Sequence, residues 1–224
     1  MKTNQLLTIF TSVLVIAVLA FLFLNDQSSE KSKTKIVQDE KISVNNQPTI
    51  GKKEAPISIV EFGDYKCPSC KEWGETIYPQ LVKDYIESGK ASFSYINVLF
   101  HGDESTLAAL ASESVYKNHP ESFWQFHKAI YEAQPDVQIH DDPWVTVEKM
   151  EEIATKTVPS LDLNKFREDL SSRSSRLESV KMDAALVEKY NVTLTPTIAV
   201  NGVILENPFD YTSIKKQIEK ELTQ

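Results

Sequence analysis

The sequence reads Ile57-Ser58-Ile59-Val60-Glu61-Phe62-Gly63-Asp64-Tyr65-Lys66-Cys67-Pro68-Ser69-Cys70 where a strand pattern runs directly into a helical one. Ile57 to Phe62 is short, rich in branched residues and bounded by Pro56 and Gly63, as is typical of a buried strand. The two cysteines that follow are the only ones in the chain. Proline is tolerated at the first helical position, so Pro68 predicts a helix with Cys67 at its N-cap. Free backbone N–H groups and the helix dipole would stabilise a thiolate there, and the thiolate is the nucleophile of disulfide exchange.

The composition is that of a globular protein. The chain has 224 residues, of which 41% are hydrophobic and 25% charged, so it can form one sizeable core or one core with an inserted subdomain. Its net charge is −8 and it contains no basic stretch. Nucleic acid is therefore excluded as a partner, since nothing in the sequence would release counterions from phosphates.

The N-terminus predicts a membrane segment. After Lys2, an uncharged apolar run extends from Leu6 to Leu24, long enough to span a hydrocarbon core of about 30 Å. Because Ala20 is followed by further apolar residues, an uncleaved anchor over residues 1–24 is favoured over a cleaved signal peptide, which stays the alternative. Residues 25–47 are polar and predict a tether, although a short extended piece around Ile42 to Ile50 could already begin the fold. Both alternatives place the rest of the chain outside the cytoplasm, where a Cys-X-X-Cys pair can act as an oxidant.

The remaining patterns predict an α/β protein with a helical insertion. Helical spacing with a kink at Pro79 leads to a second strand at Ala91–Phe100, which implies a parallel pair with a right-handed crossover. The next segment, 103–175, is almost wholly helical. A further helix, two strands about Asn201-Gly202 and a closing helix follow. We therefore assign residues 48–102 and 176–224 to one α/β domain and 103–175 to an inserted helical subdomain.

This order of elements resembles the thioredoxin fold, and the long helical insertion resembles its DsbA-like branch of thiol–disulfide oxidoreductases, in particular the membrane-anchored Gram-positive members. Two motifs carry the resemblance, which covers roughly Pro48 to the C-terminus: Glu-Phe-x-x-Tyr-x-Cys-Pro-x-Cys at Glu61 to Cys70, and Thr-Pro-Thr at Thr195 to Thr197. One dipeptide departs from the enterobacterial DsbA, because Pro68-Ser69 stands where that protein has Pro-His. The resemblance implies a thioredoxin-like fold with the helical subdomain inserted after the second strand of the βαβ unit.

The resemblance also implies roles for the two thiols. Cys67 would be the exposed attacking thiol and Cys70 the buried resolving one, in agreement with their places at the helix terminus and one turn inside it. Pro68 and Ser69 would tune the helix N-terminus. Since one helix terminus usually stabilises a thiolate only modestly, we expect Ser69 and the backbone N–H of Cys70 to donate further hydrogen bonds.

Three more residues receive roles from the resemblance. Pro196 would be a cis proline facing the thiols, and Thr195 would offer its backbone to an extended substrate. Glu61 would be a partly buried carboxylate that exchanges a proton with Cys70 through water. The alternatives are an ordinary proline at the start of a strand and a glutamate that faces solvent at a strand end.

Other interpretations of the cysteine pair remain open. A structural disulfide would close so short a loop that it removes little chain entropy. A zinc site would need two further ligands, and neither another cysteine pair nor closely spaced histidines exist. We assign no metal ligands. The four histidines are expected to pack or lie on the surface, and His140-Asp141-Asp142 is only a candidate contact for a divalent cation because it lacks a calcium-loop pattern.

These inferences predict an extracytoplasmic, membrane-bound oxidoreductase that introduces disulfide bonds into reduced exported proteins. It would need no cofactor beyond its redox-active disulfide, act as a monomer, and be reoxidised by a DsbB-like, quinone-linked membrane partner. The alternatives are an extracytoplasmic disulfide reductase with the same residues, and a peptide-binding chaperone whose disulfide is structural.

Overall fold

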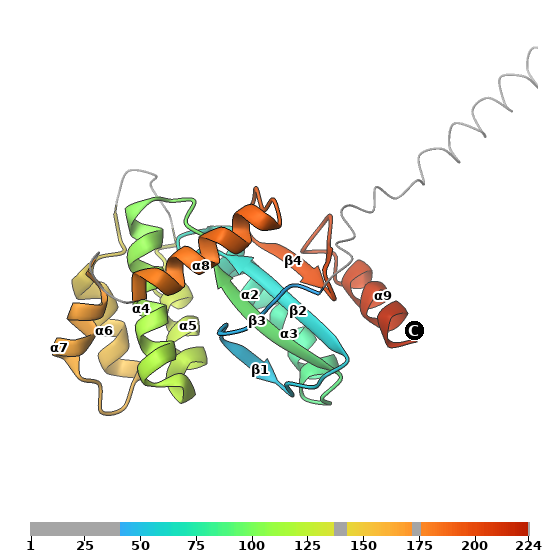
Figure 1. The fold of residues 1–224 in the computed structure, drawn as a ribbon, viewed down its shortest axis with the longest axis horizontal. Helices are drawn as coiled ribbons and strands as arrows, with labels where there is room; N and C mark the ends of the chain where they lie inside the picture. Colours follow the sequence, from blue (N-terminus) through green and yellow to red (C-terminus); the bar gives the residue numbers. More distant parts are fainter. Residues whose placement is uncertain (1–40, 137–142, 172–175, 224) are drawn as a thin grey trace, which may run out of the picture. The chain divides into compact units, whose positions relative to one another are not determined.

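The protein forms a mixed five-stranded sheet in the order β1-β3-β2-β4-β5, with helices around it (Figure 1). This computed structural model describes residues 41–136, 143–171 and 176–223. The central strand β2 runs parallel to β3 and antiparallel to β4, while β1 pairs with the outer edge of β3. The strands are β1 Thr49–Gly51, β2 Ile57–Gly63, β3 Ala91–Asn97, β4 Thr197–Val200 and β5 Val203–Ile204.

Strand β2 is buried on both faces, which explains its nearly continuous apolar sequence. Ile57 and Ile59 pack with residues of α2 (Pro68–Thr76), α3 (Tyr78–Leu81) and α9 (Tyr211–Leu222) on one face. Val60 and Phe62 pack on the other face with the C-terminal end of α8 (Arg176–Lys189). Side chains alternate along a strand, so Glu61 points to the face that α2 covers.

The helix after the cysteines is broken at the predicted kink. Helix α2 ends at Thr76, α3 follows from Tyr78, and the last turn, Val82–Ile86, is a π-helix. The break lies at Ile77, just ahead of Pro79, whose ring nitrogen cannot donate a helical hydrogen bond. The two pieces still present Trp73, Leu81 and Tyr85 to one core, as the four-residue spacing predicted.

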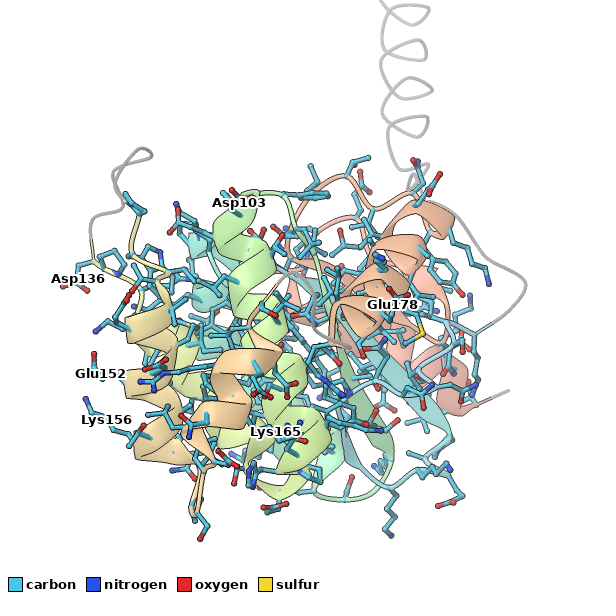
Figure 2. The ribbon with its side chains drawn as sticks, turned by 60° about the vertical axis from the view of Figure 1, so that its left-hand side comes forward. Asp103, Asp136, Glu152, Lys156, Lys165 and Glu178 are labelled. Carbon is cyan, nitrogen blue, oxygen red and sulfur yellow. The ribbon has the colours of Figure 1, made fainter. Side chains whose placement is uncertain are left out.

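The helical insertion has a core of its own. Its helices are α4 Asp103–Asn118, α5 Phe123–Glu132, α6 Val147–Thr157 and α7 Leu163–Asp169, with a 3₁₀ turn at Pro120–Ser122. Buried side chains that include Phe126, Met150 and Phe166 fill the space between them. Charged side chains lie outside, where Lys156 pairs with Glu152 at 2.6 Å (Figure 2). The insertion follows β3, the second strand of the β2-α2-β3 unit, so the predicted fold class is confirmed.

The predicted hairpin is also present. Asn201 and Gly202 join β4 to β5 with φ angles of 48° and 88°. Both residues lie in the left-handed region that a two-residue type I′ turn requires, which is why this dipeptide predicted the turn.

The folded part begins before the predicted boundary at residue 48. Ile42 is only 3% exposed, and Gln47 donates to Asp183 Oδ1 at 2.7 Å. The predicted anchor, residues 1–24, and most of the predicted tether lie outside the described residues. Within the described ranges, no helix is both long enough and apolar enough to cross a membrane.

A buried acidic pair links the insertion to the sheet. Glu113 of α4 and Asp183 of α8 are 3% and 1% exposed, and Asn97 of β3 donates its side-chain amide to Asp183 Oδ2 at 2.8 Å. Burial and the neighbouring Asp183 raise the pKa of Glu113 to about 8. Burial raises the pKa of Asp183 to about 6, against the hydrogen bonds from Asn97 and Gln47. Both carboxyls therefore bind protons more tightly in the folded protein than in water.

Candidate active site

The two thiols lie at the start of α2, as predicted. Cys67 is the N-cap residue, with extended backbone angles, and Pro68 opens the helix. Cys70 is fully buried, whereas Cys67 is 7% exposed. Cys67 is therefore the more accessible thiol of the pair, although it is less exposed than we predicted. Both cysteines are in the free thiol form.

The surroundings shift the pKa values of the two thiols in opposite directions. A hydrogen bond from the Cys70 thiol is the largest influence that lowers the pKa of Cys67, to about 6, in opposition to burial. The Thr195 side chain and the backbone N–H groups of Cys70 and Ser69 also lower the pKa of Cys67, in line with the two further donors expected from the sequence. Burial, together with the hydrogen bond to Cys67, raises the pKa of Cys70 well above its ordinary value. Cys67 is thus the thiol that ionises first.

The Thr195–Pro196 loop faces the pair. The peptide bond between these residues is cis, as predicted. The Thr195 carbonyl oxygen lies 3.4 Å from Cys67 Sγ. Pro196 is buried, Thr195 is half-buried, and the preceding Leu194 is exposed. The loop thus brings backbone groups and an apolar side chain next to the more accessible thiol.

Glu61 lies on β2 and is more deeply buried than predicted. It is 2% exposed, so the alternative of a solvent-facing glutamate is wrong. Burial, followed by the charge of Cys67, raises its pKa well above the ordinary range. Gly63 leaves space for it, because a Cβ there would come within 2.9 Å of Glu61 Oε1 and 2.5 Å of the Tyr95 ring. Within the described part of the chain, Oε1 has no hydrogen-bond partner.

Sequence reasoning missed Asp64, which holds the loop in front of Cys67. Its backbone carbonyl accepts from Cys67 N at 2.9 Å, and its backbone N–H points to Cys70 Sγ at 3.5 Å. Its buried carboxylate is surrounded by donors from its own loop, from the loop after β3 and from the first turn of α4: Lys66 N at 2.9 Å, Phe100 N at 3.0 Å, His101 Nδ1 at 2.8 Å and Ser105 Oγ at 2.8 Å. An acidic residue between a buried strand and a cysteine was the only signal in the sequence, because most of these donors come from beyond β3.

Sequence reasoning also missed the clamp that the insertion applies to the same loop. Gln134, just after α5, donates its side-chain amide to the carbonyl oxygens of Tyr65 at 2.7 Å and Cys67 at 3.2 Å. Glu104 of α4 pairs with Lys66 and also accepts from the backbone N–H of Val145 at 2.9 Å. The insertion therefore fixes the backbone that carries the reactive cysteine.

Replacing Gln134 by leucine is expected to lower the free energy of unfolding by about 1–2 kcal/mol, because the Tyr65 carbonyl loses its donor and the Cys67 carbonyl keeps only the longer hydrogen bond from Lys71 N at 3.4 Å. Urea unfolding of the oxidised protein measures the change. Gln80→Leu is the control, since Gln80 is exposed on α3 and its loss should cost less than about 0.5 kcal/mol. An equal loss of unfolding free energy in the two variants would contradict the role of Gln134 in holding this loop.

The histidines have structural roles, as far as the structure describes them. His127 is half-buried next to three tyrosines and lies 2.9 Å from the hydroxyl of Tyr65. Burial lowers its pKa to about 3, so it stays neutral at physiological pH. His101 pairs with Asp64, and His119 lies 4.0 Å from Glu121. His140-Asp141-Asp142 falls outside the described residues, and among the described ones no cluster of His, Cys, Asp and Glu is placed to hold a metal.

Comparison with known proteins identifies the family. A thioredoxin family model matches residues 43–220. The chain is 44% identical over 180 residues to disulfide bond formation protein D of Bacillus subtilis, which covers 80% of this chain and 79% of that protein. The chain belongs to the DsbA-like thiol–disulfide oxidoreductases.

Two further similarities extend over most of this DsbA-like chain. It is 35% identical over 227 residues to a probable disulfide bond formation protein D of Bacillus cereus, with 99% of each chain covered. The crystal structure of oxidised BdbD from Bacillus subtilis matches with a TM-score of 0.78 and 43% identity, covering 83% of this chain and 97% of that one. The DsbA-like protein is thus an enzyme that exchanges protein thiols and disulfides, and the Gram-positive resemblance drawn from its motifs is confirmed.

Proposed function

We propose that this enzyme is an extracytoplasmic oxidase that introduces disulfide bonds into exported proteins through Cys67 and Cys70. The observation that carries the proposal is the stabilised thiolate of Cys67, whose pKa is lowered to about 6. An ordinary thiol has a pKa of about 8.5, so the reduced pair gains about 1.4 kcal/mol at pH 7, or about 30 mV of oxidising strength. A more stable reduced form makes the disulfide a stronger oxidant.

The predicted export of the chain and the name of its relative also favour disulfide formation over disulfide reduction. The apolar run from Leu6 to Leu24 would carry the catalytic part across a membrane and tether it there. Outside the cytoplasm no thiol pool keeps such a pair reduced. The Bacillus subtilis relative is itself called a disulfide bond formation protein.

The reaction takes two exchange steps. A thiolate of the reduced client attacks Sγ of Cys67, the Cys67–Cys70 bond breaks, and a mixed disulfide between the client and Cys67 forms. Cys70 leaves as a thiolate and takes up a proton, since burial disfavours its charge. The client's second thiol then loses its proton and attacks the client sulfur of the mixed disulfide. Cys67 departs as a stabilised thiolate, so the client is oxidised and the enzyme dithiol is reduced.

Glu61 and the Thr195–Pro196 loop would assist these steps. Burial raises the pKa of Glu61 well above its ordinary range and so favours its protonated form, which could provide the proton that Cys70 needs and take it back on reoxidation. The loop would align an extended client beside Cys67, with the exposed Leu194 against an apolar side chain of the client. Pro68 and Ser69 complete the site by opening α2 and by donating to the thiolate.

A second enzyme must restore the disulfide after each turnover. The reoxidant would be a DsbB-like membrane protein that passes the two electrons to a quinone. The enzyme itself would need no cofactor besides its cysteine pair and would act as a monomer.

The reduction potential of the pair tests the direction of exchange. We expect a value more positive than about −200 mV, toward those of disulfide isomerases and DsbA. Equilibration of the full-length protein with glutathione buffers, followed by alkylation of the free thiols, measures it. A value more negative than about −200 mV, toward the −270 mV of thioredoxin, would favour the reductase.

A further inference from the structure

A large apolar cleft lies beside the cysteine pair, between α2, α3 and α5. Its volume is about 780 Å³, which is within the range of small-molecule sites. Aromatic rings form a continuous wall: Phe93 lies 5.9 Å from Trp73, 4.8 Å from Tyr78 and 5.6 Å from Trp124, measured between ring centroids. Cys70 lines the cleft and Cys67 does not, so this is a separate opening from the one that a client would use.

A buried carboxyl without a partner also lines this cleft. Glu61 is 2% exposed, and no described residue offers a hydrogen bond to its Oε1. Three lysines line the cleft: Lys128 pairs with Glu132, Lys71 donates to the Gln134 carbonyl at 3.3 Å, and Lys83 is exposed, and none of the three forms an ion pair with Glu61. A carboxylate in such surroundings is costly unless a cation or donors compensate it.

We propose that the cleft binds a small organic amine, with its ammonium group on the Glu61 carboxylate and its apolar stem along the aromatic wall. The ammonium would give Glu61 the opposite charge that it lacks. Rings such as Trp73 and Tyr78 would attract the cation through their faces, and the stem would remove apolar surface from water. This inference does not depend on the direction of disulfide exchange.

Binding should release a proton from Glu61. The titratable groups that face this carboxyl are Cys67, Cys70, Tyr65, Tyr78, Tyr95, Tyr131 and His127. Near pH 7 the tyrosines, Cys70 and His127 stay neutral because burial disfavours their charged forms, and Cys67 is mostly ionised already. Since burial raises the pKa of Glu61 and an adjacent ammonium would lower it again, Glu61 is the group from which we expect the proton to be released.

Isothermal titration of the reduced, full-length protein with 2-phenylethylamine and its neutral counterpart 2-phenylethanol tests the proposal. We expect the amine to bind about tenfold more tightly than the alcohol. Titrations in two buffers of different ionisation enthalpy should reveal net proton release for the amine alone. Glu61→Gln should reduce the preference for the amine to less than about twofold. Equal binding of amine and alcohol, or a preference that Glu61→Gln retains, would overturn the proposal.

Gly74 allows a second test that leaves the carboxyl in place. It lies on α2 at the cleft, and a Cβ added there meets nothing within 4 Å. The Cβ of Gly74→Phe should therefore be accommodated, and its ring is expected to occupy the cleft and abolish binding of both ligands. Thr76→Phe, at an exposed position of the same helix that does not line the cleft, should bind like the unaltered protein. Unchanged amine affinity in Gly74→Phe would place the ligand elsewhere and would equally refute the site.

Discussion

Cys67→Ser is expected to abolish the oxidation of a reduced test protein such as ribonuclease A, with a loss of rate of at least about 10³-fold. A serine hydroxyl cannot form the Cys67–Cys70 disulfide, and it is not ionised near pH 7. Cys70→Ser should fail differently, because Cys67 keeps its own thiol but loses the hydrogen bond from the Cys70 thiol and has no second thiol to resolve a mixed disulfide. Oxidised glutathione should first convert Cys67 of the Cys70→Ser variant to a mixed disulfide, with one glutathione thiol released. A client thiolate then attacks Cys67 Sγ and displaces the second glutathione thiol, so a non-reducing gel should show clients trapped on Cys70→Ser and none on Cys67→Ser.

The two variants also separate the alternatives for the whole protein. A disulfide reductase would lose its activity in both variants, as an oxidase would, and the reduction potential of the unaltered protein would distinguish the two enzymes. A peptide-binding chaperone would keep its activity in both variants, since neither substitution removes the Thr195–Pro196 loop. Full oxidation of the test protein by Cys67→Ser would therefore contradict an enzymatic role for the pair.

The stability of the folded protein is expected to decrease as pH rises from about 5 to about 8. Glu113 has a pKa of about 8 in the folded protein, compared with about 4.3 for a glutamate in an unfolded chain. The folded state therefore binds the proton more tightly, and its advantage is complete below the lower value and lost as pH passes the higher one. The loss at pH 8 is on the order of 4 kcal/mol for this group, and Asp183 acts in the same direction.

Urea unfolding of the oxidised protein at several pH values, with a chelator present, measures this effect. In the oxidised form Cys67 and Cys70 do not titrate, so their pKa shifts do not contribute to the pH dependence of the unfolding free energy. Glu113→Gln should flatten the pH dependence without removing it, because Asp183 and Glu61 remain. Glu152→Gln, on the outer face of α6, should leave the pH dependence unchanged. An equal slope for Glu113→Gln and the unaltered protein would show that Glu113 is not the group responsible.

Local signals in the sequence were enough to predict the main features of the fold. Pro68 after Cys67 predicted where α2 begins, Pro79 predicted the break in the following helix, and Asn201-Gly202 predicted the hairpin. Each of these signals acts through the backbone of its own residue or that of near neighbours. The cis Thr195–Pro196 bond and the position of Glu61 behind the thiols came instead from family resemblance, and the structure has both.

The remainder of the site depends on contacts that no local pattern encodes. The carboxylate of Asp64 receives donors from residues about 100 to 105, and Gln134 reaches back to Tyr65 and Cys67. The polar composition also led to a wrong boundary at the start of the fold. Ile42 and Gln47 lie in a polar stretch that was assigned to the tether, yet both residues are buried. Two apolar side chains among polar ones, Ile42 and Val44, were too weak a signal to end the predicted tether.

The side-chain amide of Gln134 makes the helical insertion part of the structure that holds the active-site loop. Because this amide binds the carbonyl groups on both sides of Lys66, excising the insertion would remove one of the two sets of hydrogen bonds that hold the loop, and would leave those made by Asp64. A shortened enzyme, reduced to the sheet and its flanking helices, would keep its cysteines but would hold the loop that presents them with fewer hydrogen bonds. The sheet and its insertion must therefore be transplanted, trimmed or diversified together.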